Sequence, residues 1–256
     1  MATGRTVKKH TEVYMGGFDI TGYSMDIGDL GMVFAEAEGT AFNDAVIGAY
    51  NDQGDVQIGP LNGIFDNTAT IGLHIVAKDA GVKRDVMVPI GIRAAAAEGD
   101  PVFSATVPQL AYQAQPTAGN LVAVNIPFGN WALDAITLLY AQVWGDLAHE
   151  KSAETGVNSA VAVIDGAAQT ALGGYMMYQV FTSNGTVAIK IQDSSVNSDG
   201  NFGDLATSGD VDASAAPKSG IIALGKTATV ERYIRWQIAL NTATTVTFAL
   251  AFVRGR

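Results

Sequence analysis

The sequence predicts a mainly β protein with two β-sandwich-like domains, the first of which carries one or two short helices. Apolar residues alternate with polar residues in several runs, as expected for half-buried strands. The 29 glycines gather with Asn, Asp and Ser between these runs, where turns are favoured. The 256 residues exceed the roughly 100 to 150 residues of a typical domain, so we divide the chain into domains at residues 1–150 and 151–256.

Helices are expected only near the start of the chain. Residues 41–50 would follow an N-cap at Thr40, and residues 71–80 would begin after Thr70 and stop at Gly81. Both segments are too short to be stable without tertiary packing.

Strands are expected over much of the remaining first domain. In residues 86–92, apolar side chains recur at every second position, and Pro89 lacks a backbone donor, which favours a sheet edge or a bulge. Residues 102–107 and 121–128 are expected to pair with each other. Residues 131–149 fit neither the helical nor the strand period.

Two hairpins are expected in the second domain. Residues 175–183 and 186–192 flank Asn184-Gly185, and this dipeptide favours the positive φ angles of a type I′ turn. Residues 230–240 and 245–254 form a second pair, which we expect to bury one face.

Small and polar residues separate these elements. Residues 148–174 have the composition of a domain boundary, and residues 193–204 and 207–219 have that of exposed loops.

The excess negative charge lies entirely in the first 155 residues. This part has 18 Asp and Glu against eight Lys and Arg, whereas residues 156–256 have seven of each. Between Lys9 and Lys78 there are ten acidic residues and no basic one. Such a face repels the nucleic acid backbone, so we expect the two halves to face different neighbours.

Residue types and motifs argue against catalysis. The absence of cysteine excludes disulfides, thiolate metal sites and cysteine nucleophiles. His10, His74 and His149 lie far apart in sequence, and we interpret them as surface or helix-face residues. Nucleophile-elbow, phosphate-loop and zinc-hydrolase motifs do not occur. We therefore expect a protein that is not an enzyme and has no catalytic, cofactor-binding or metal site.

Targeting signals are also not found in the sequence. No apolar run reaches the roughly 20 residues of a membrane span. Residues 1–5 are polar and basic with no apolar stretch behind them. We therefore expect no secretion signal, no membrane partner and folding in a cytoplasm.

One loop weakly resembles a calcium site. Ser195, Asn197, Asp199 and Asn201 surround a glycine, but the twelfth position would be Ala206, where a bidentate Glu belongs. An ordinary solvated loop is favoured.

Two other short patterns have simple explanations. Asn184-Gly185-Thr186 matches a glycosylation acceptor, although the expected turn explains it. Glu36 and Glu38 form a carboxylate pair of the kind used in glycoside chemistry, but such pairs arise by chance on an acid-rich surface.

Aromatic residues of the second half allow two interpretations. Trp236 with Tyr175, Tyr178 and Tyr233 could form a sugar-binding face. Strand alternation instead places Trp236 with apolar neighbours, so packing in the core is favoured.

A basic cluster stands at the start of the acidic half. Arg5, Lys8 and Lys9 with His10 would suit an arm that docks on an acidic neighbouring copy. A disordered, solubilising terminus explains them equally well.

Near the end of the chain, ATVERYIRW (228–236) and VTFALAFVR (246–254) resemble the C-terminal signature of the tail tube proteins, or major tail proteins, of long-tailed bacteriophages. This resemblance is strongest over residues 174–254. TVAIKIQD (186–193) and FGDL (202–205) belong to the same pattern. A looser resemblance over residues 13–130 includes GPLNGIFD (59–66).

The resemblance implies a structural virion protein. In this family, strands of the first domain join those of neighbouring copies in a closed barrel, and rings, commonly of six copies, stack into a hollow tail tube. DNA would pass through without specific binding, the second domain would lie outside, and the tape measure and terminator would be partners.

The charge distribution is consistent with this expectation. An acidic lumen lets DNA slide, because binding would require Lys or Arg to neutralise phosphates. Six copies would bring together 60 excess negative charges, a repulsion screened over about 8 Å at physiological salt. Backbone pairing and apolar contacts must exceed this repulsion.

Two alternatives remain. A capsid decoration or surface fibre protein would use the second sandwich to cap a shell. A carbohydrate-binding module would use Trp236 or the tyrosines.

Overall fold

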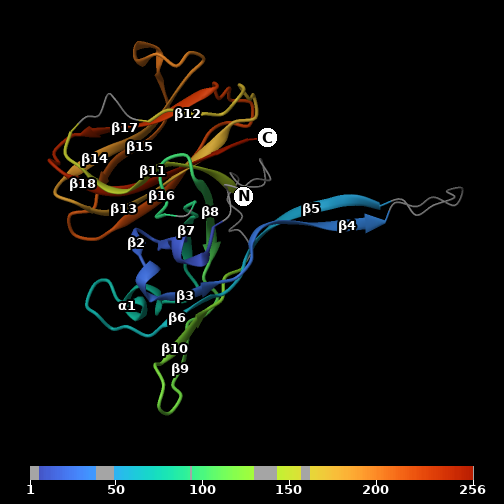
Figure 1. The fold of residues 1–256 in the computed structure, drawn as a ribbon, viewed down its shortest axis with the longest axis vertical. Helices are drawn as coiled ribbons and strands as arrows, with labels where there is room; N and C mark the ends of the chain where they lie inside the picture. The colour runs from blue at the N-terminus through green and yellow to red at the C-terminus, as the bar shows by residue number, and fades with distance from the viewer. Residues whose placement is uncertain (1–5, 39–48, 93, 130–142, 157–161, 256) are drawn as a thin grey trace, which may run out of the picture.

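The computed structural model describes residues 6–38, 49–92, 94–129, 143–156 and 162–255, and these form the mainly β fold that the sequence predicts (Figure 1). Helical turns occur at η1 (Lys8–His10), η2 (Thr21–Tyr23), α1 (Leu73–Ala77) and η3 (Asp199–Asn201). The strands are β1 (Tyr14–Met15), β2 (Phe18–Asp19), β3 (Ser24–Ile27), β4 (Leu30–Glu38), β5 (Ala49–Ile58), β6 (Leu61–Ile64), β7 (Lys83–Pro89), β8 (Pro101–Pro108), β9 (Gln113–Gln115), β10 (Ala123–Ile126), β11 (Trp144–Glu154), β12 (Ile164–Asp165), β13 (Gly174–Ser183), β14 (Thr186–Ser194), β15 (Gly203–Asp212), β16 (Lys218–Ala223), β17 (Tyr233–Leu240) and β18 (Val246–Arg254).

One antiparallel sheet of eight strands contains strands from both halves of the sequence. Its order is β16-β13-β18-β11-β8-β7-β1-β2. β11 is the link, because it pairs with β8 on one side and with β18 on the other. Residue 150 lies inside this strand, and the division into domains at 1–150 and 151–256 stays a prediction.

Hydrogen bonds join the two ends of this sheet. The buried Gln179 of β13 accepts a hydrogen bond from the Gly17 N–H at 2.6 Å and donates one to the Asp85 carbonyl at 3.0 Å. Ser219 of β16 donates to the Asp85 carboxylate at 2.6 Å. We call this set of contacts the seam. Buried side chains from these strands, together with Ala96, form one hydrophobic cluster. It consists of Tyr14, Met87, Ala96, Val102, Leu147, Met177, Ala249 and Ala251.

A four-stranded sheet, β12-β17-β14-β15, packs on one face of β13, β18 and β11 and completes a sandwich. Trp236 lies in the core between these sheets with 3% of its surface exposed, which confirms the core interpretation of this residue. Ile234 and Ile238, on the same side of β17, are buried with it.

Both hairpins predicted for the second half are wrong, although all four strands exist. β13 pairs with β16 and β18, whereas β14 pairs with β15 and β17, so Asn184-Gly185 connects two sheets. Neither residue of this dipeptide has the positive φ of a type I′ turn. β17 and β18 also lie in opposite sheets. The sandwich is favoured because it buries apolar residues on both faces of β13 and β18.

Part of the predicted loop at 207–219 is also wrong. Residues 207–212 belong to β15, and residues 218–219 begin β16. Polar residues in these strands are tolerated because β15 and β16 are edge strands of their sheets.

The third sheet, β3-β6-β10-β9, packs with α1 against β7 and β8. The pairing predicted between 102–107 and 121–128 is wrong, because β8 pairs with β7 and β11 while β10 pairs with β6 and β9. Pro89 ends β7, which lies inside the eight-stranded sheet and not at its edge. At this terminal position, its carbonyl still accepts a hydrogen bond from the Glu12 N–H.

The helix predicted at 71–80 exists as the shorter α1. Thr70 does not cap it: its φ is 71°, and Gly72 occupies the N-cap. The Asp66 carbonyl instead accepts a hydrogen bond from the His74 N–H at 2.9 Å. Residues 41–48 of the other predicted helix lie outside the described residues, and residues 49–50 begin β5.

Candidate interaction site

β4 and β5 form a two-stranded ribbon that projects away from the rest of the molecule (Figure 1). Their register runs from Leu30 opposite Ile58 to Glu38 opposite Ala49. At about 3.3 Å per residue, nine residues extend the ribbon by roughly 30 Å. Among the described strands, neither β4 nor β5 has a further partner. The ribbon therefore presents two unpaired strand edges.

Two glycines form the root of the ribbon. The Gly28 N–H donates to the Pro60 carbonyl at 3.2 Å, and the Gly59 N–H donates to the Asp29 carbonyl at 2.8 Å. A Cβ atom on Gly59 would lie 2.5 Å from the Gly28 Cα. The two strands of the ribbon can therefore leave the body side by side only because both residues lack a side chain.

The first residues of the ribbon are anchored in the core. Val56 and Ile58 are buried, and Leu30 and Met32 pack against the same cluster. Val33, one residue further along β4, is already 48% exposed. The core thus holds the root of the ribbon, and its outer part leaves the body.

The ribbon has only one sign of charge. β4 and β5 contain four acidic residues, Glu36, Glu38, Asp52 and Asp55, and no Lys or Arg. An isolated two-stranded ribbon is marginally stable in water. An acidic one would gain from a neighbour that covers its edges and supplies positive charge.

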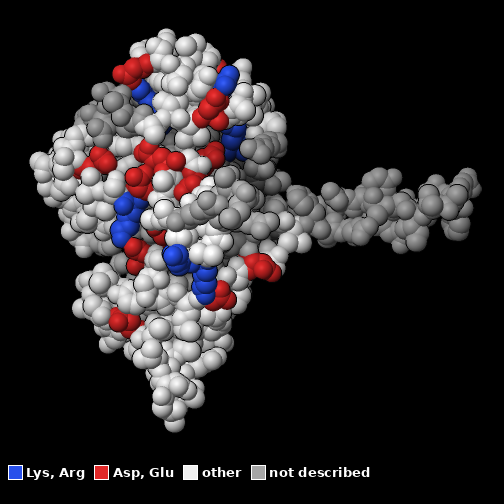
Figure 2. Space-filling model, viewed as in Figure 1, with Lys and Arg blue, Asp and Glu red and all other residues white. Residues whose placement is uncertain are grey.

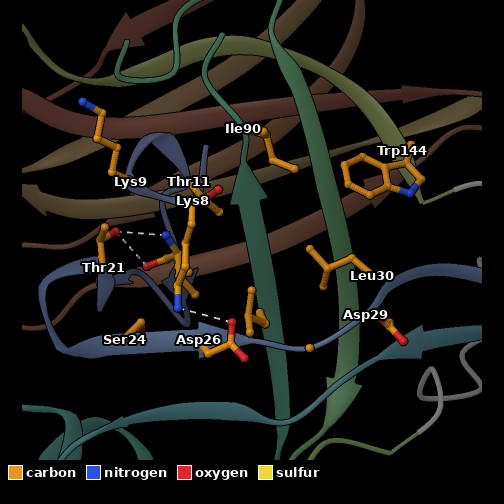
Figure 3. Close-up of a pocket in the computed structure, with 13 residues that line it drawn as sticks. Lys8, Lys9, Thr11, Thr21, Ser24, Asp26, Asp29, Leu30, Ile90 and Trp144 are labelled. Carbon is orange, nitrogen blue, oxygen red and sulfur yellow. Dashed lines mark hydrogen bonds and ion pairs between the residues drawn. The ribbon is translucent and has the colours of Figure 1, made fainter. Parts of the chain in front are cut away.

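A groove of about 770 Å³ lies at the root of the ribbon (Figure 3). Its apolar lining comes from five separate segments and consists of Val13, Ile27, Leu30, Ile90 and Trp144. Trp144 is 36% exposed and packs edge-on against Phe103, with ring centroids 5.7 Å apart. An exposed Trp beside aliphatic side chains is typical of a contact surface.

Charged residues form the rim of this groove. Lys8 pairs with Asp26 at 3.3 Å, and both side chains are largely exposed, so this ion pair contributes at most about 1 kcal/mol. Lys9 points away from that pair (Figure 3), and no described carboxylate pairs with it. Asp29 lies on the ribbon side of the groove.

The groove also borders an open strand. β3 is the edge strand of its sheet, and Ser24, Asp26 and Ile27 of β3 line the groove. Thr21 holds the neighbouring turn, because its hydroxyl accepts a hydrogen bond from the Val13 N–H at 2.9 Å. The structure therefore places two residues of the predicted basic cluster, Lys8 and Lys9, beside an apolar surface and an unpaired strand edge. Arg5 lies outside the described residues.

Sequence reasoning missed the central residues of this site. Nothing in the sequence links Ile90, which directly follows β7, or Trp144, which begins β11, to Leu30. A usable signal was present at the root, since Gly28-Asp29 and Gly59-Pro60 are both typical of a turn or a change of direction.

The three histidines do not come together. His149 is buried on β11, which overturns its interpretation as a surface or helix-face residue. Its ring stacks on Phe248 with centroids 4.0 Å apart and contacts Trp236 edge-on. The Nδ1 atom lies 3.2 Å from the Phe248 carbonyl, and Nε2 lies 3.2 Å from Glu154.

Burial lowers the pKa of His149, although Glu154 and Glu150 oppose this effect. Burial also raises the pKa of Glu98, whose carboxylate accepts a hydrogen bond from the Trp236 indole at 2.6 Å. These groups form a polar cluster beside the core of the sandwich.

The proposed sugar-binding face is not present as a surface. Trp236 and Tyr175 are buried, and the Tyr175 hydroxyl donates to the Ser104 carbonyl at 2.9 Å. Tyr178 and Tyr233 are partly buried, and the guanidinium of Arg232 lies 4.8 Å from the Tyr233 ring centroid.

The loop that weakly resembles a calcium site is engaged internally. Asp199 forms an ion pair with Arg235, whose guanidinium also lies 4.3 Å from the Phe202 ring centroid. Among the described residues, no group of three or more His, Asp or Glu is arranged to hold a metal. Asn184 bonds across the sheet connection, since its side-chain oxygen accepts from the Thr244 and Thr245 N–H groups. Glu36 and Glu38 belong to the ribbon.

Charge on the body is mixed. Figure 2 shows carboxylates over much of one face, interspersed with Lys and Arg. The lower end of the molecule shows no charged residue in this view. Residues 101–129, which include β9 and β10, contain no Asp, Glu, Lys or Arg. The ribbon is one of the elements whose sequence has acidic residues and no basic one, and β15, with Asp204, Asp210 and Asp212, is another. In the same described part, no helix is long and apolar enough to span a bilayer.

Comparisons with known proteins give little further information. No protein family matches the sequence, and no curated protein does. One solved structure with a similar course is the Dit protein of phage SPP1, described as a paradigm of the hub adsorption apparatus in phages that infect Gram-positive bacteria. The match has 10% identity and a TM-score of 0.31, and it covers 95% of this chain and 98% of that one. At these values the likeness does not establish a common fold.

Proposed function

We propose that this chain is a structural subunit of a bacteriophage tail that assembles with copies of itself into rings stacked as a hollow tube. The observation that carries the proposal is the β4–β5 ribbon, which leaves the body with two unpaired edges. Proteins blunt or cover such edges, and another chain is the simplest cover. The sequence resemblance to tail tube proteins supports the same assembly.

The residues of the site fit a role in assembly. Unpaired strand edges, apolar contact surface and charged groups of both signs favour association between copies, and the ribbon and groove together have all three. In the proposed tube, excess carboxylates would face the channel and keep DNA from binding to the wall. Other tail proteins, such as a tape measure and a terminator, would contact the ends or the interior of the tube.

Self-assembly is tested by measuring molar mass against protein concentration. Light scattering coupled to size-exclusion chromatography should show multiples of the 26.6 kDa chain. Electron microscopy of the same sample should show rings or tubes with an open lumen. A protein that remains monomeric at high concentration contradicts the proposal, and shell-bound copies without a lumen would favour a capsid decoration or fibre protein.

A variant without the ribbon separates folding from assembly. Leu30 and Ile58 lie opposite each other, so residues 31–57 can be replaced by Asn-Gly to close a two-residue turn. We expect this variant to keep the circular dichroism spectrum of a β protein and to elute as a monomer. Assembly that persists unchanged would remove the ribbon from the interface.

A further inference from the structure

We propose that the groove lined by Lys9, Ile90 and Trp144 is the docking site for the β4–β5 ribbon of a second copy of this chain. The inference rests on the proposed self-assembly and names its contact surface. It assigns a receptor to the acidic ribbon, for which the isolated chain offers no partner among its described residues.

The occupant must come from another molecule. Leu30, the first residue of β4, lines the groove itself, and the ribbon then projects away from it (Figure 1, Figure 3). The ribbon is rooted at Gly28 and Gly59, whose backbones touch. A chain held in this way cannot fold its ribbon back into its own groove without breaking the root.

Charge complementarity at Lys9 supports the ribbon as occupant, although Asp26 and Asp29 also lie on the rim of the groove. The described ribbon has four carboxylates and no cation. On the groove, Lys9 has no described carboxylate partner, and Lys8 shares Asp26 through an exposed pair at 3.3 Å. Docking would therefore bring carboxylates to Lys9 and would relieve part of the repulsion among acidic copies.

Shape and backbone chemistry support the same contact. β3 borders the groove as an unpaired edge, so an incoming strand can add to it by main-chain hydrogen bonds. Behind that edge, Ile90 and Trp144 offer apolar surface. The sequence of β4 supplies Phe34, Ala35 and Ala37 between and beside its carboxylates.

A photo-crosslink tests the contact directly. Trp144 is replaced by p-benzoylphenylalanine, and isotope-labelled and unlabelled chains are mixed, assembled and irradiated. Mass spectrometry should find crosslinked peptides from residues 30–58 of the differently labelled copy. Leu172, which is 49% exposed in the second half, receives the same photo-reactive residue as a control and should not capture these peptides.

Charge reversal gives an independent measurement. Lys9→Glu should weaken self-association at least about tenfold, because it places a carboxylate against the acidic ribbon. Lys226→Glu, at an exposed position far along the sequence, is the matched control and should change it little. Adding Glu36→Lys to Lys9→Glu should restore part of the lost association.

The outcomes distinguish the two proposals. If the unaltered protein assembles but Trp144 crosslinks to other segments, or only within its own copy, the groove is not the receptor and self-assembly still stands. If the unaltered protein stays monomeric, both proposals fail. Equal effects of Lys9→Glu and Lys226→Glu also contradict the assignment of the groove.

Discussion

Replacing Gln179 with Leu tests whether the seam holds the two ends of the eight-stranded sheet together. Gln179 is fully buried on β13 and reaches the Gly17 N–H and the Asp85 carbonyl. Leucine has a similar volume, so the substitution removes hydrogen bonds while leaving little cavity. The expected loss of stability therefore comes from buried polar groups that are left without a hydrogen-bond partner.

The magnitude follows from which groups lose their only partner. The Asp85 carbonyl keeps the hydrogen bond from the Gly16 N–H at 3.0 Å, so it stays satisfied. The Gly17 N–H has no second acceptor among the described residues. One orphaned buried donor costs about 1–3 kcal/mol. In a chain of this size, each kcal/mol lowers the melting temperature by roughly 2–4 °C.

Urea denaturation and thermal melting of Gln179→Leu provide the assay. Gln115→Leu, on the exposed strand β9, is the control and should stay within about 0.5 kcal/mol of the unaltered protein. If Gln179→Leu is as stable as this control, the Gly17 N–H is not orphaned and our account of the seam is refuted.

Three further predictions concern the core, the ribbon root and pH. Trp236→Ala should lower the free energy of unfolding by about 3–5 kcal/mol in urea titrations, since the indole is buried; a surface-like change below about 0.5 kcal/mol would falsify its place in the core. Gly59→Val should reduce self-association in light scattering without loss of the β circular dichroism spectrum, because its Cβ would meet Gly28. Gly31→Val is the control, since its Cβ has open space, and this variant should assemble normally. Equal behaviour of the two variants would contradict the role of Gly28 and Gly59 in forming the root of the ribbon. The lowered pKa of His149 means that the unfolded chain takes up this proton at higher pH, so stability should fall as pH drops below about 6.5. His149→Phe should lack this part of the pH dependence in unfolding measurements between pH 7 and pH 5, and an unchanged slope would show that other groups cause it.

Local sequence patterns predicted elements better than their partners. Residues 175–183, 186–192 and 245–254 all form strands, and residues 71–80 contain a helix. The pairing partners predicted for these strands were wrong. Alternation of apolar and polar residues indicates that one face of a strand is buried, but it does not indicate which strand or sheet covers that face. Asn184-Gly185 is an example, since its backbone turns between sheets where a hairpin was expected.

The candidate site was predicted only in fragments. The basic residues Lys8 and Lys9 and the acidic span between Lys9 and Lys78 were visible in the sequence. Their relation was not, because the groove is assembled from segments as distant as Thr11 and Trp144. His149 shows the converse error, since a lone polar residue gave no sign that the sandwich would bury it.

By itself, the sequence determined the mainly β character of this protein, most of its strands and the separation of its net charge, because alternation, turn residues and charge are properties of neighbouring residues. Only the tertiary structure decided which strands pair, that β11 joins both halves in one sheet, and that an acidic ribbon leaves the body beside a groove with basic residues on its rim. Those features depend on contacts between residues far apart in the chain. They are decided by how much apolar surface the whole fold can bury and by how many backbone N–H and C=O groups it can pair in hydrogen bonds.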